Sequence, residues 1–176
     1  MCSRNAAPTV SDGQKQLQLL RYFKGTTDLG PTLSSDPAAY PTGPHGVSIY
    51  AVSDSSHACH PDGRSQSAYL IGVGLPGASA PFLGYSSKEG SSVSLSPLES
   101  EYVTLSRCAR PLLYYRQFAH DLGFPQHGPS RMYQDNQPAI NLATAHQIPA
   151  KSRHIAQRHH FLRWLHSIGQ VSLHHQ

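Results

Sequence analysis

The chain has 176 residues and a mass of 19.2 kDa, which suits one domain built around one hydrophobic core. Charged residues make up only 14% of it, so charge repulsion is too weak to keep the whole chain disordered. No apolar run approaches the roughly 20 residues that span a bilayer, and Met1 is not followed by the basic segment and apolar stretch that are typical of a signal peptide. Three widely spaced cysteines, Cys2, Cys59 and Cys108, fit neither a disulfide framework nor a zinc site built on cysteine pairs. We therefore expect an intracellular protein in a reducing compartment, with no membrane partner.

The net charge of +4 is concentrated in the last quarter of the chain. All ten acids lie at or before Asp135, where ten basic residues balance them, and four basic residues follow with no acid among them. A basic terminal segment can bind nucleic-acid phosphates, although a solvated helix face without a ligand has the same composition. The candidate nucleic-acid-binding residues of this segment are Lys151, Arg153, His154 and Arg158.

The N-terminal part of the chain is expected to lie outside the main domain. Residues 1–12 lack periodicity and predict a loose tail, and apolar residues at helical spacing then predict a short helix that begins at Gln14 and ends before Gly25. Four prolines and three glycines predict a linker at residues 30–46. The domain itself is expected to occupy residues 47–176.

Three β-rich segments are predicted to form an antiparallel meander at the start of the domain. The first is apolar, spans residues 47–52, and leads directly into Ser53 and Asp54. The second and third are residues 68–73 and 81–86, and they follow after short polar connections.

A long helix is predicted from Pro97 to about Leu122. Ser96 can cap its first turn, and Glu99 stands where a capping-box acid would return the hydrogen bond. Gly123 follows as a helix stop. The pattern beyond it predicts a strand, two helices and a last strand at residues 131–134, 138–145, 154–168 and 171–173. This order of elements indicates an α/β fold.

Three acids stand at the ends of predicted strands or on the predicted core-facing side of a helix, where an isolated carboxylate can be poorly solvated. Asp54 follows an apolar strand, Asp135 closes a later strand, and Glu101 begins the stripe of the long helix that should face the sheet. That stripe continues with Leu105, Cys108 and Leu112. Each acid also has an ordinary explanation: a turn residue for Asp54, a turn or cap for Asp135, and the helix dipole for Glu101.

Converging carboxylates would concentrate negative charge that two Mg²⁺ or Mn²⁺ ions can neutralise. Two such ions stabilise both the attacking water and the leaving oxygen of a phosphodiester displacement. Paired carboxylates also hydrolyse glycosidic bonds, but the chain shows no aromatic lining for a sugar cleft. The segment His57–His60 looks like a metal cluster, yet it lacks the second cysteine pair of a structural zinc site. The candidate catalytic and metal-binding residues are therefore Asp54, Glu101 and Asp135.

Several short segments resemble, in order and spacing, the ribonuclease H domain of copia-type LTR retrotransposon polyproteins. Residues 19–30 resemble the end of the reverse transcriptase thumb leading into the connection. The other matching segments are residues 53–58, 63–65, 85–88, 94–102, 135–140 and 151–155. The glutamate lies between the two aspartates in this chain, whereas in integrases of the same fold family it comes last.

The resemblance implies a ribonuclease H-like fold with a mixed five-stranded sheet flanked by helices. It also implies two Mg²⁺ or Mn²⁺ ions and cleavage of the RNA strand of RNA/DNA hybrids in reverse transcription, within a larger polyprotein. Asp54, Glu101 and Asp135 match the first three metal-binding acids of the family. The implied location is a cytoplasmic virus-like particle or the nucleus.

Two features depart from the family pattern. The fourth metal-binding acid usually follows a His-Ile pair, where this chain has Ala156 after His154 and Ile155. Alanine cannot bind a cation, so one ion would lose a ligand. The chain also stops at Gln176, before the tail that usually follows the last strand. The alternative hypothesis is therefore a catalytically impaired remnant that keeps the fold and at most binds nucleic acid.

Overall fold

The parts of the chain that the computed structural model describes are residues 7–29, 48–74, 82–145 and 156–176. The chain forms two compact units, Met1–Thr32 and Leu33–Gln176. The expected linker at residues 30–46 lies outside the described residues, so a domain boundary after residue 46 stays a prediction. No helix in the described parts is both long and apolar enough to cross a membrane.

The first unit contains helix α1, Val10–Gly25, which begins earlier than predicted. Thr9 and Asp12 form a reciprocal cap: the Asp12 N–H donates to the Thr9 side chain at 3.3 Å, and the Thr9 N–H donates to the Asp12 carboxylate at 2.9 Å. The prediction of a loose tail up to residue 12 is therefore wrong for its last three residues, because this cap satisfies the first helical N–H groups.

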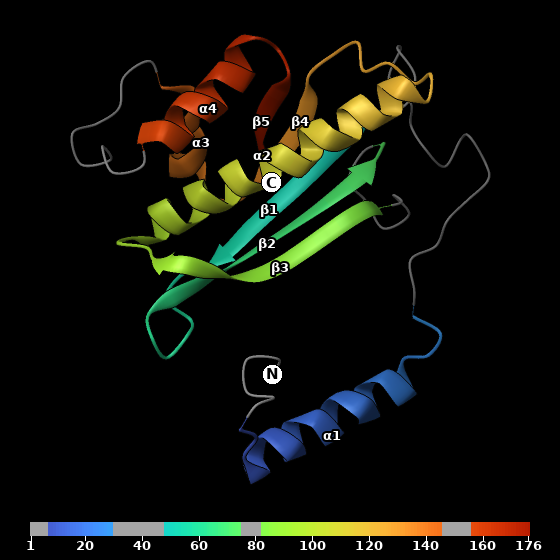
Figure 1. Ribbon diagram of the computed structural model, residues 1–176, viewed down its shortest axis with the longest axis vertical. Helices are drawn as coiled ribbons and strands as arrows, with labels where there is room; N and C mark the ends of the chain where they lie inside the picture. The colour runs from blue at the N-terminus through green and yellow to red at the C-terminus, as the bar shows by residue number, and fades with distance from the viewer. Residues whose placement is uncertain (1–6, 30–47, 75–81, 146–155) are drawn as a thin grey trace. The chain divides into compact units, whose positions relative to one another are not determined.

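The second unit is built on a mixed five-stranded sheet with the strand order β3-β2-β1-β4-β5 (Figure 1). Its strands are β1 (Ile49–Ser56), β2 (Arg64–Val73), β3 (Phe82–Val93), β4 (Ser130–Gln134) and β5 (Val171–His175). The first three form the predicted antiparallel meander, and β4 and β5 join it in parallel beside β1. The predicted mixed sheet is therefore confirmed.

All five strands are longer than predicted, and the extension of β1 moves a candidate residue. β1 continues to Ser56, so Asp54 lies within the strand, paired with Ala68, and not in a turn after it. β3 continues well past Ser86 because its polar second half pairs with β2. Pairing with a neighbouring strand outweighs the low β propensity of serine, glycine and lysine there.

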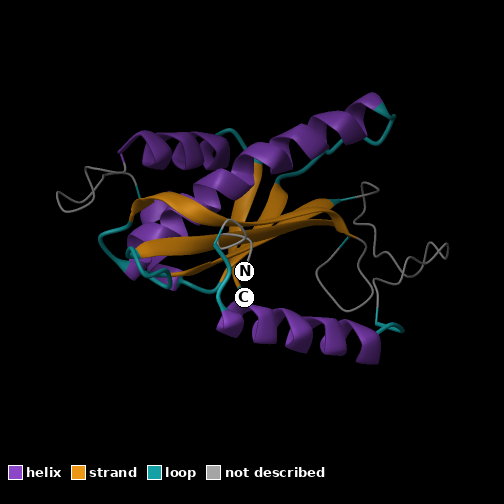
Figure 2. Cartoon of the chain, turned by 60° about the horizontal axis from the view of Figure 1, so that its bottom comes forward, coloured by secondary structure: helices purple, strands orange, loops and turns teal. Residues whose placement is uncertain are grey.

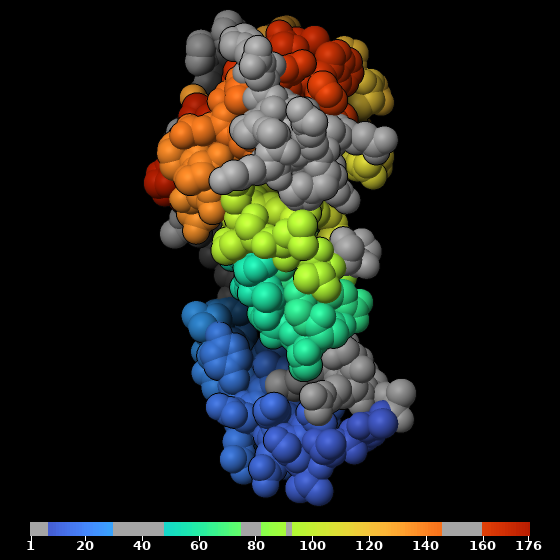
Figure 3. All heavy atoms as spheres, turned by 90° about the vertical axis from the view of Figure 1, so that its left-hand side faces the viewer, coloured from blue at the N-terminus to red at the C-terminus, as the bar shows by residue number. Residues whose placement is uncertain are grey.

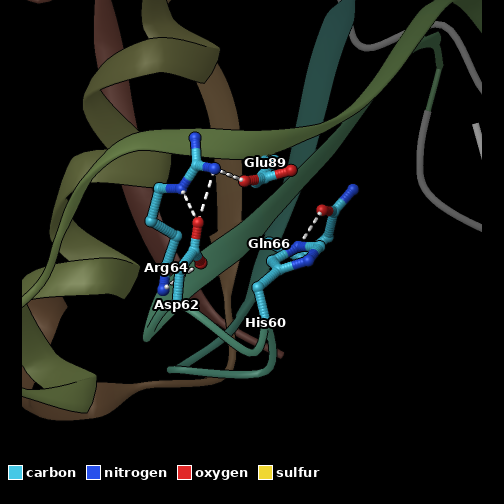
Figure 4. A network of polar contacts seen from close by, with 5 residues as sticks. All are labelled: His60, Asp62, Arg64, Gln66 and Glu89. Atoms are coloured by element: carbon cyan, nitrogen blue, oxygen red, sulfur yellow. Dashed lines mark hydrogen bonds and ion pairs between the residues drawn. The ribbon is translucent and has the colours of Figure 1, made fainter. Parts of the chain in front are cut away.

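Ion pairs reinforce the extended part of the β2–β3 hairpin (Figure 4). The guanidinium group of Arg64, at the start of β2, contacts the carboxylates of both Asp62 and Glu89. Glu89 lies on β3 opposite Gln66, so the contact joins the two strands across the polar end of the hairpin.

Three helices accompany the sheet: α2 (Pro97–Asp121), α3 (Gln137–Thr144) and α4 (Ala156–Ser167). Figure 2 shows α2 extended along one face of the sheet. Ser96 caps α2 as predicted, and its side chain accepts from the Glu99 N–H at 3.1 Å. The Glu99 carboxylate, however, accepts from the Leu95 N–H at 2.7 Å, one residue before the cap, so the cap differs from the predicted box.

The apolar stripe of α2 forms the centre of the core. Leu105, Cys108 and Leu112 are fully buried, which confirms the predicted orientation of the helix. They pack in one cluster with buried strand residues that include Ile49, Ala51, Ile71 and Met132. The same orientation brings Glu101, one turn before Leu105, toward the sheet.

Gly72 on β2 lies so close to the ring of Tyr50 that we expect a larger residue there to destabilise the fold. A Cβ atom at Gly72 would lie 2.5 Å from Cζ of Tyr50, whose ring covers the glycine from the opposite residue of β1. We expect Gly72→Ala to lower the free energy of unfolding by about 2 kcal/mol, because a buried ring must move. Urea unfolding measures this loss. Gly128→Ala, where a Cβ would meet nothing within 4 Å, is the control, and equal stability of the two variants would contradict the prediction.

Candidate metal centre

Three acids from three elements meet at one end of the sheet. Asp54 lies near the end of β1, Asp135 directly follows β4, and Glu101 lies near the start of α2. β1 and β4 are parallel neighbours, so both strands deliver their acids to the same edge. One carboxylate oxygen from each acid lies within 4.8 Å of the other two. Figure 3 faces this end of the sheet, with the β1–β2 turn in teal, the β3–α2 junction in light green and α3 in orange.

The three carboxylates differ in their exposure to water. Asp54 and Asp135 are exposed, whereas Glu101 keeps only 7% of its accessible surface. Burial raises the pKa of Glu101 from 4.5 to about 7, and the charges of Asp135 and Asp54 also raise it. Hydrogen bonds from Ser55 and Gln134 lower it in part. Without a cation, Glu101 is thus about half protonated near neutral pH, and a bound cation would favour its charged form.

The structure excludes one ordinary explanation for each of the two aspartates. Asn136, and not Asp135, caps α3: its side chain accepts from the Ala139 N–H at 3.0 Å. Asp54 is part of a paired strand and not of a turn. Asp135 itself lies in the strand-to-helix connection between β4 and α3, so for this residue only the cap is excluded.

The structure adds one residue that the sequence analysis missed. The side chain of Gln134, the last residue of β4, is fully buried. Its Nε2 donates to Glu101 Oε2 at 3.0 Å, and its Oε1 accepts from the Asp135 N–H at 2.8 Å. The only signal in the sequence is its place directly before a candidate acid.

The histidine and cysteine cluster of the β1–β2 turn makes other contacts. His60 Nε2 lies 2.9 Å from Gln66 Oε1, and His57 Nδ1 lies 3.4 Å from Ser65 Oγ (Figure 4 shows the His60 contact). Cys59 is exposed. Within the described parts of the chain, Asp54, Glu101 and Asp135 are the only set of three such residues that offers ligand atoms this close together.

The side chains of the candidate nucleic-acid-binding residues lie outside the part of the chain that the structure describes. Lys151, Arg153 and His154 lie outside the described residues, and for Arg158 the structure describes the helical backbone alone. The same holds for Ala156, the first residue of α4. The predictions made for these positions stay predictions.

Comparison with curated proteins identifies relatives among plant retrotransposons. The chain is 28% identical over 148 residues to the "Retrovirus-related Pol polyprotein from transposon TNT 1-94" of Nicotiana tabacum. It is 27% identical over 157 residues to the corresponding polyprotein from transposon RE2 of Arabidopsis thaliana. The matches cover 82% and 89% of this chain but 10% of each relative, so the chain spans about a tenth of their length. No family model matches the chain. These relatives confirm the resemblance to retrotransposon polyproteins.

Comparison with solved structures concerns the fold. LC11-RNase H1, solved in complex with an RNA/DNA hybrid, matches with a TM-score of 0.51 and 12% identity, over 73% of this chain and 84% of that one. RNase H1 from Halobacterium salinarum NRC-1 covers the same shares, with a TM-score of 0.48 and 14% identity. The similarity to LC11-RNase H1 shows that the chain has a ribonuclease H-like fold, which confirms the predicted fold class.

Proposed function

We propose that the protein is a divalent-metal-dependent ribonuclease H that cleaves the RNA strand of RNA/DNA hybrids as part of a retrotransposon polyprotein. One observation carries the proposal: Asp54, Glu101 and Asp135 present carboxylate oxygens within 4.8 Å of one another. The ribonuclease H-like fold and the similarity to Pol polyproteins support it. A turn does not explain the position of Asp54, and a helix cap does not explain that of Asp135.

The donor set suits Mg²⁺ or Mn²⁺, because both ions prefer oxygen ligands and the three acids supply nothing else. When bound, two such ions activate a water molecule and stabilise the departing 3′ oxygen. Asp54 and Asp135 are exposed and open to a phosphodiester from solvent, whereas Glu101 is buried and accepts a hydrogen bond from Gln134 on the protein side. Glu101 must release its proton for the site to reach full negative charge.

The hybrid itself would be selected by its shape and by contacts to the 2′-hydroxyl groups of the RNA strand. Lys151, Arg153, His154 and Arg158 are proposed to contact its phosphates, because the excess positive charge of the chain lies in their segment. No base-specific motif is needed for this mode of recognition.

Cleavage of a labelled RNA/DNA hybrid tests the proposal. We expect the protein to cut the RNA strand in Mg²⁺ or Mn²⁺ and to lose this activity in EDTA. Asp54→Asn should lower the cleavage rate by about 100-fold or more, since it removes a charged ligand and keeps the shape of the side chain. Asp62→Asn, which changes an exposed aspartate of the β1–β2 turn, is the matched control and should cut normally. Equal cleavage by the Asp54→Asn variant would remove the site assignment.

The alternative, a remnant that only binds nucleic acid, is favoured by one observation, the alanine at position 156. A remnant would bind the hybrid at low salt and cut it in neither metal. Fluorescence anisotropy on the same labelled hybrid separates the two functions, because it measures binding independently of turnover.

A further inference from the structure

We propose that Gln134 is a positioning residue that fixes two of the three acids through a single side-chain amide. The inference rests on the proposed function and assigns a role to a residue outside the acid cluster itself. It is drawn from the contacts of Gln134 with Glu101 and Asp135.

The donor half of the amide acts on Glu101. Gln134 Nε2 donates to Glu101 Oε2 at 3.0 Å, and Ser53 Oγ lies 3.4 Å from the same nitrogen. Both side chains are buried, Gln134 completely, so water does not compete for this bond. The contact restricts the rotation of a carboxylate that would otherwise turn about its own bond.

The acceptor half acts on the backbone that carries Asp135. Gln134 Oε1 accepts from the Asp135 N–H at 2.8 Å and lies 3.4 Å from the Asn136 nitrogen. These two N–H groups lie where β4 ends and α3 begins, so the bond determines how the chain leaves the strand. The side chain of Asp135 projects from this same turn.

Only one orientation of the amide satisfies both halves. If the amide were turned over, its oxygen would face the Glu101 carboxylate and its NH₂ group would face the Asp135 N–H. Both contacts would then be repulsive. The position of Glu101 and the path of the chain at Asp135 are therefore coupled through one rigid group before any cation arrives. Removing a residue that orients metal ligands typically weakens metal affinity by about 10- to 100-fold. We expect an effect of about this size when the Gln134 amide is removed.

The test compares Gln134→Met with a matched core variant, Thr104→Val. Methionine keeps the size of the side chain and removes both halves of the amide. Thr104 is fully buried one turn along α2 from Glu101, and its hydroxyl lies 2.8 Å from Ser67 Oγ and from the Ser100 carbonyl oxygen. Its replacement removes a buried hydrogen bond without touching any of the three acids.

The primary measurement is the affinity of the folded protein for Mn²⁺ by isothermal titration calorimetry. We expect Gln134→Met to weaken Mn²⁺ binding about tenfold or more and Thr104→Val to leave it within about twofold. Hydrogen exchange of the Asp135 amide should also accelerate in Gln134→Met and not in Thr104→Val. If Gln134→Met does not fold, Gln134→Asn replaces it, because an amide one methylene shorter cannot reach both partners.

The outcomes separate this inference from the proposed function. Unchanged Mn²⁺ affinity in a folded Gln134 variant of a metal-binding, active protein would overturn the positioning role alone. Equal weakening by Thr104→Val would also overturn it, because the effect would then follow from lost core stability. A parent protein that neither binds Mn²⁺ nor cuts the hybrid would overturn the proposed function, and this inference with it.

Discussion

Replacing Glu101 by glutamine is expected to lower the rate of hybrid cleavage by about 1000-fold while making the metal-free protein more stable at neutral and alkaline pH. Glutamine keeps the shape of the side chain but supplies no charge to a cation, and Glu101 is the buried member of the three acids. The activity is measured as single-turnover cleavage of a labelled RNA/DNA hybrid, and the stability as urea unfolding in EDTA.

The gain in stability follows from the raised pKa of Glu101, about 7 in the folded protein against 4.5 ordinarily. Because the folded state favours the protonated acid, the parent protein is most stable in this respect below pH 4.5 and loses stability as the pH rises toward and through 7. At pH values above 7, the free energy of unfolding is lowered by at most about 3 kcal/mol through this carboxyl group. Glutamine does not titrate, so the advantage of the variant should be small at pH 5 and largest near pH 8.

Added metal is expected to make the parent protein more stable than Glu101→Gln. Mn²⁺ or Mg²⁺ should stabilise the parent through binding to its folded form and should stabilise Glu101→Gln far less. Parallel pH profiles of the two proteins in EDTA would show that the environment of Glu101 differs from the one described. Undiminished cleavage by the variant would remove Glu101 from the site.

The elements that were predicted correctly are those with a local signal in the sequence. The start of α2 is specified by Ser96 and Pro97, and its buried face by apolar residues at helical spacing. The full length of β3 could not be predicted, because its polar half is a strand only through pairing with β2. The cap of α1 could have been predicted, because Thr9 and Asp12 stand at the spacing of a capping box. Aspartate is a less usual acid in this motif than glutamate.

The candidate site was predictable for a different reason. With only ten acids in the chain, those at strand ends and on a core-facing helix stand out, and the topology of the sheet then brings them together. The raised pKa of Glu101 was not predictable, because it depends on burial and on charges contributed by distant segments. The role of Gln134 depends on contacts of 2.8 and 3.0 Å, and no residue pattern encodes these.

Replacing Arg116 by methionine is expected to cause a large loss of stability, about 3 kcal/mol, with little change in the chemistry of the site. Arg116 lies on α2 with 8% of its surface exposed, and burial lowers the pKa of its guanidinium group. Its hydrogen-bond partners in the described parts of the chain are all neutral and lie just before or at the start of β4 and β5: Gln126, Gly128, Ser130 and Gln170. Methionine would keep the apolar stem of the side chain and leave these acceptors, of which Ser130 is buried, without their donor.

Urea unfolding of the metal-free protein measures this loss, and Arg110→Met, at an exposed position of the same helix, is the matched control. Arg116→Lys should recover only part of the stability, because an ammonium group lacks the planar fork that reaches several acceptors at once. Arg116 bonds to Ser130 at the start of β4, whereas Asp135 follows the end of that strand, so cleavage per folded molecule should stay within about twofold. Equal stability of Arg116→Met and Arg110→Met would show that the buried contacts contribute nothing, and full recovery by lysine would show that charge alone is required.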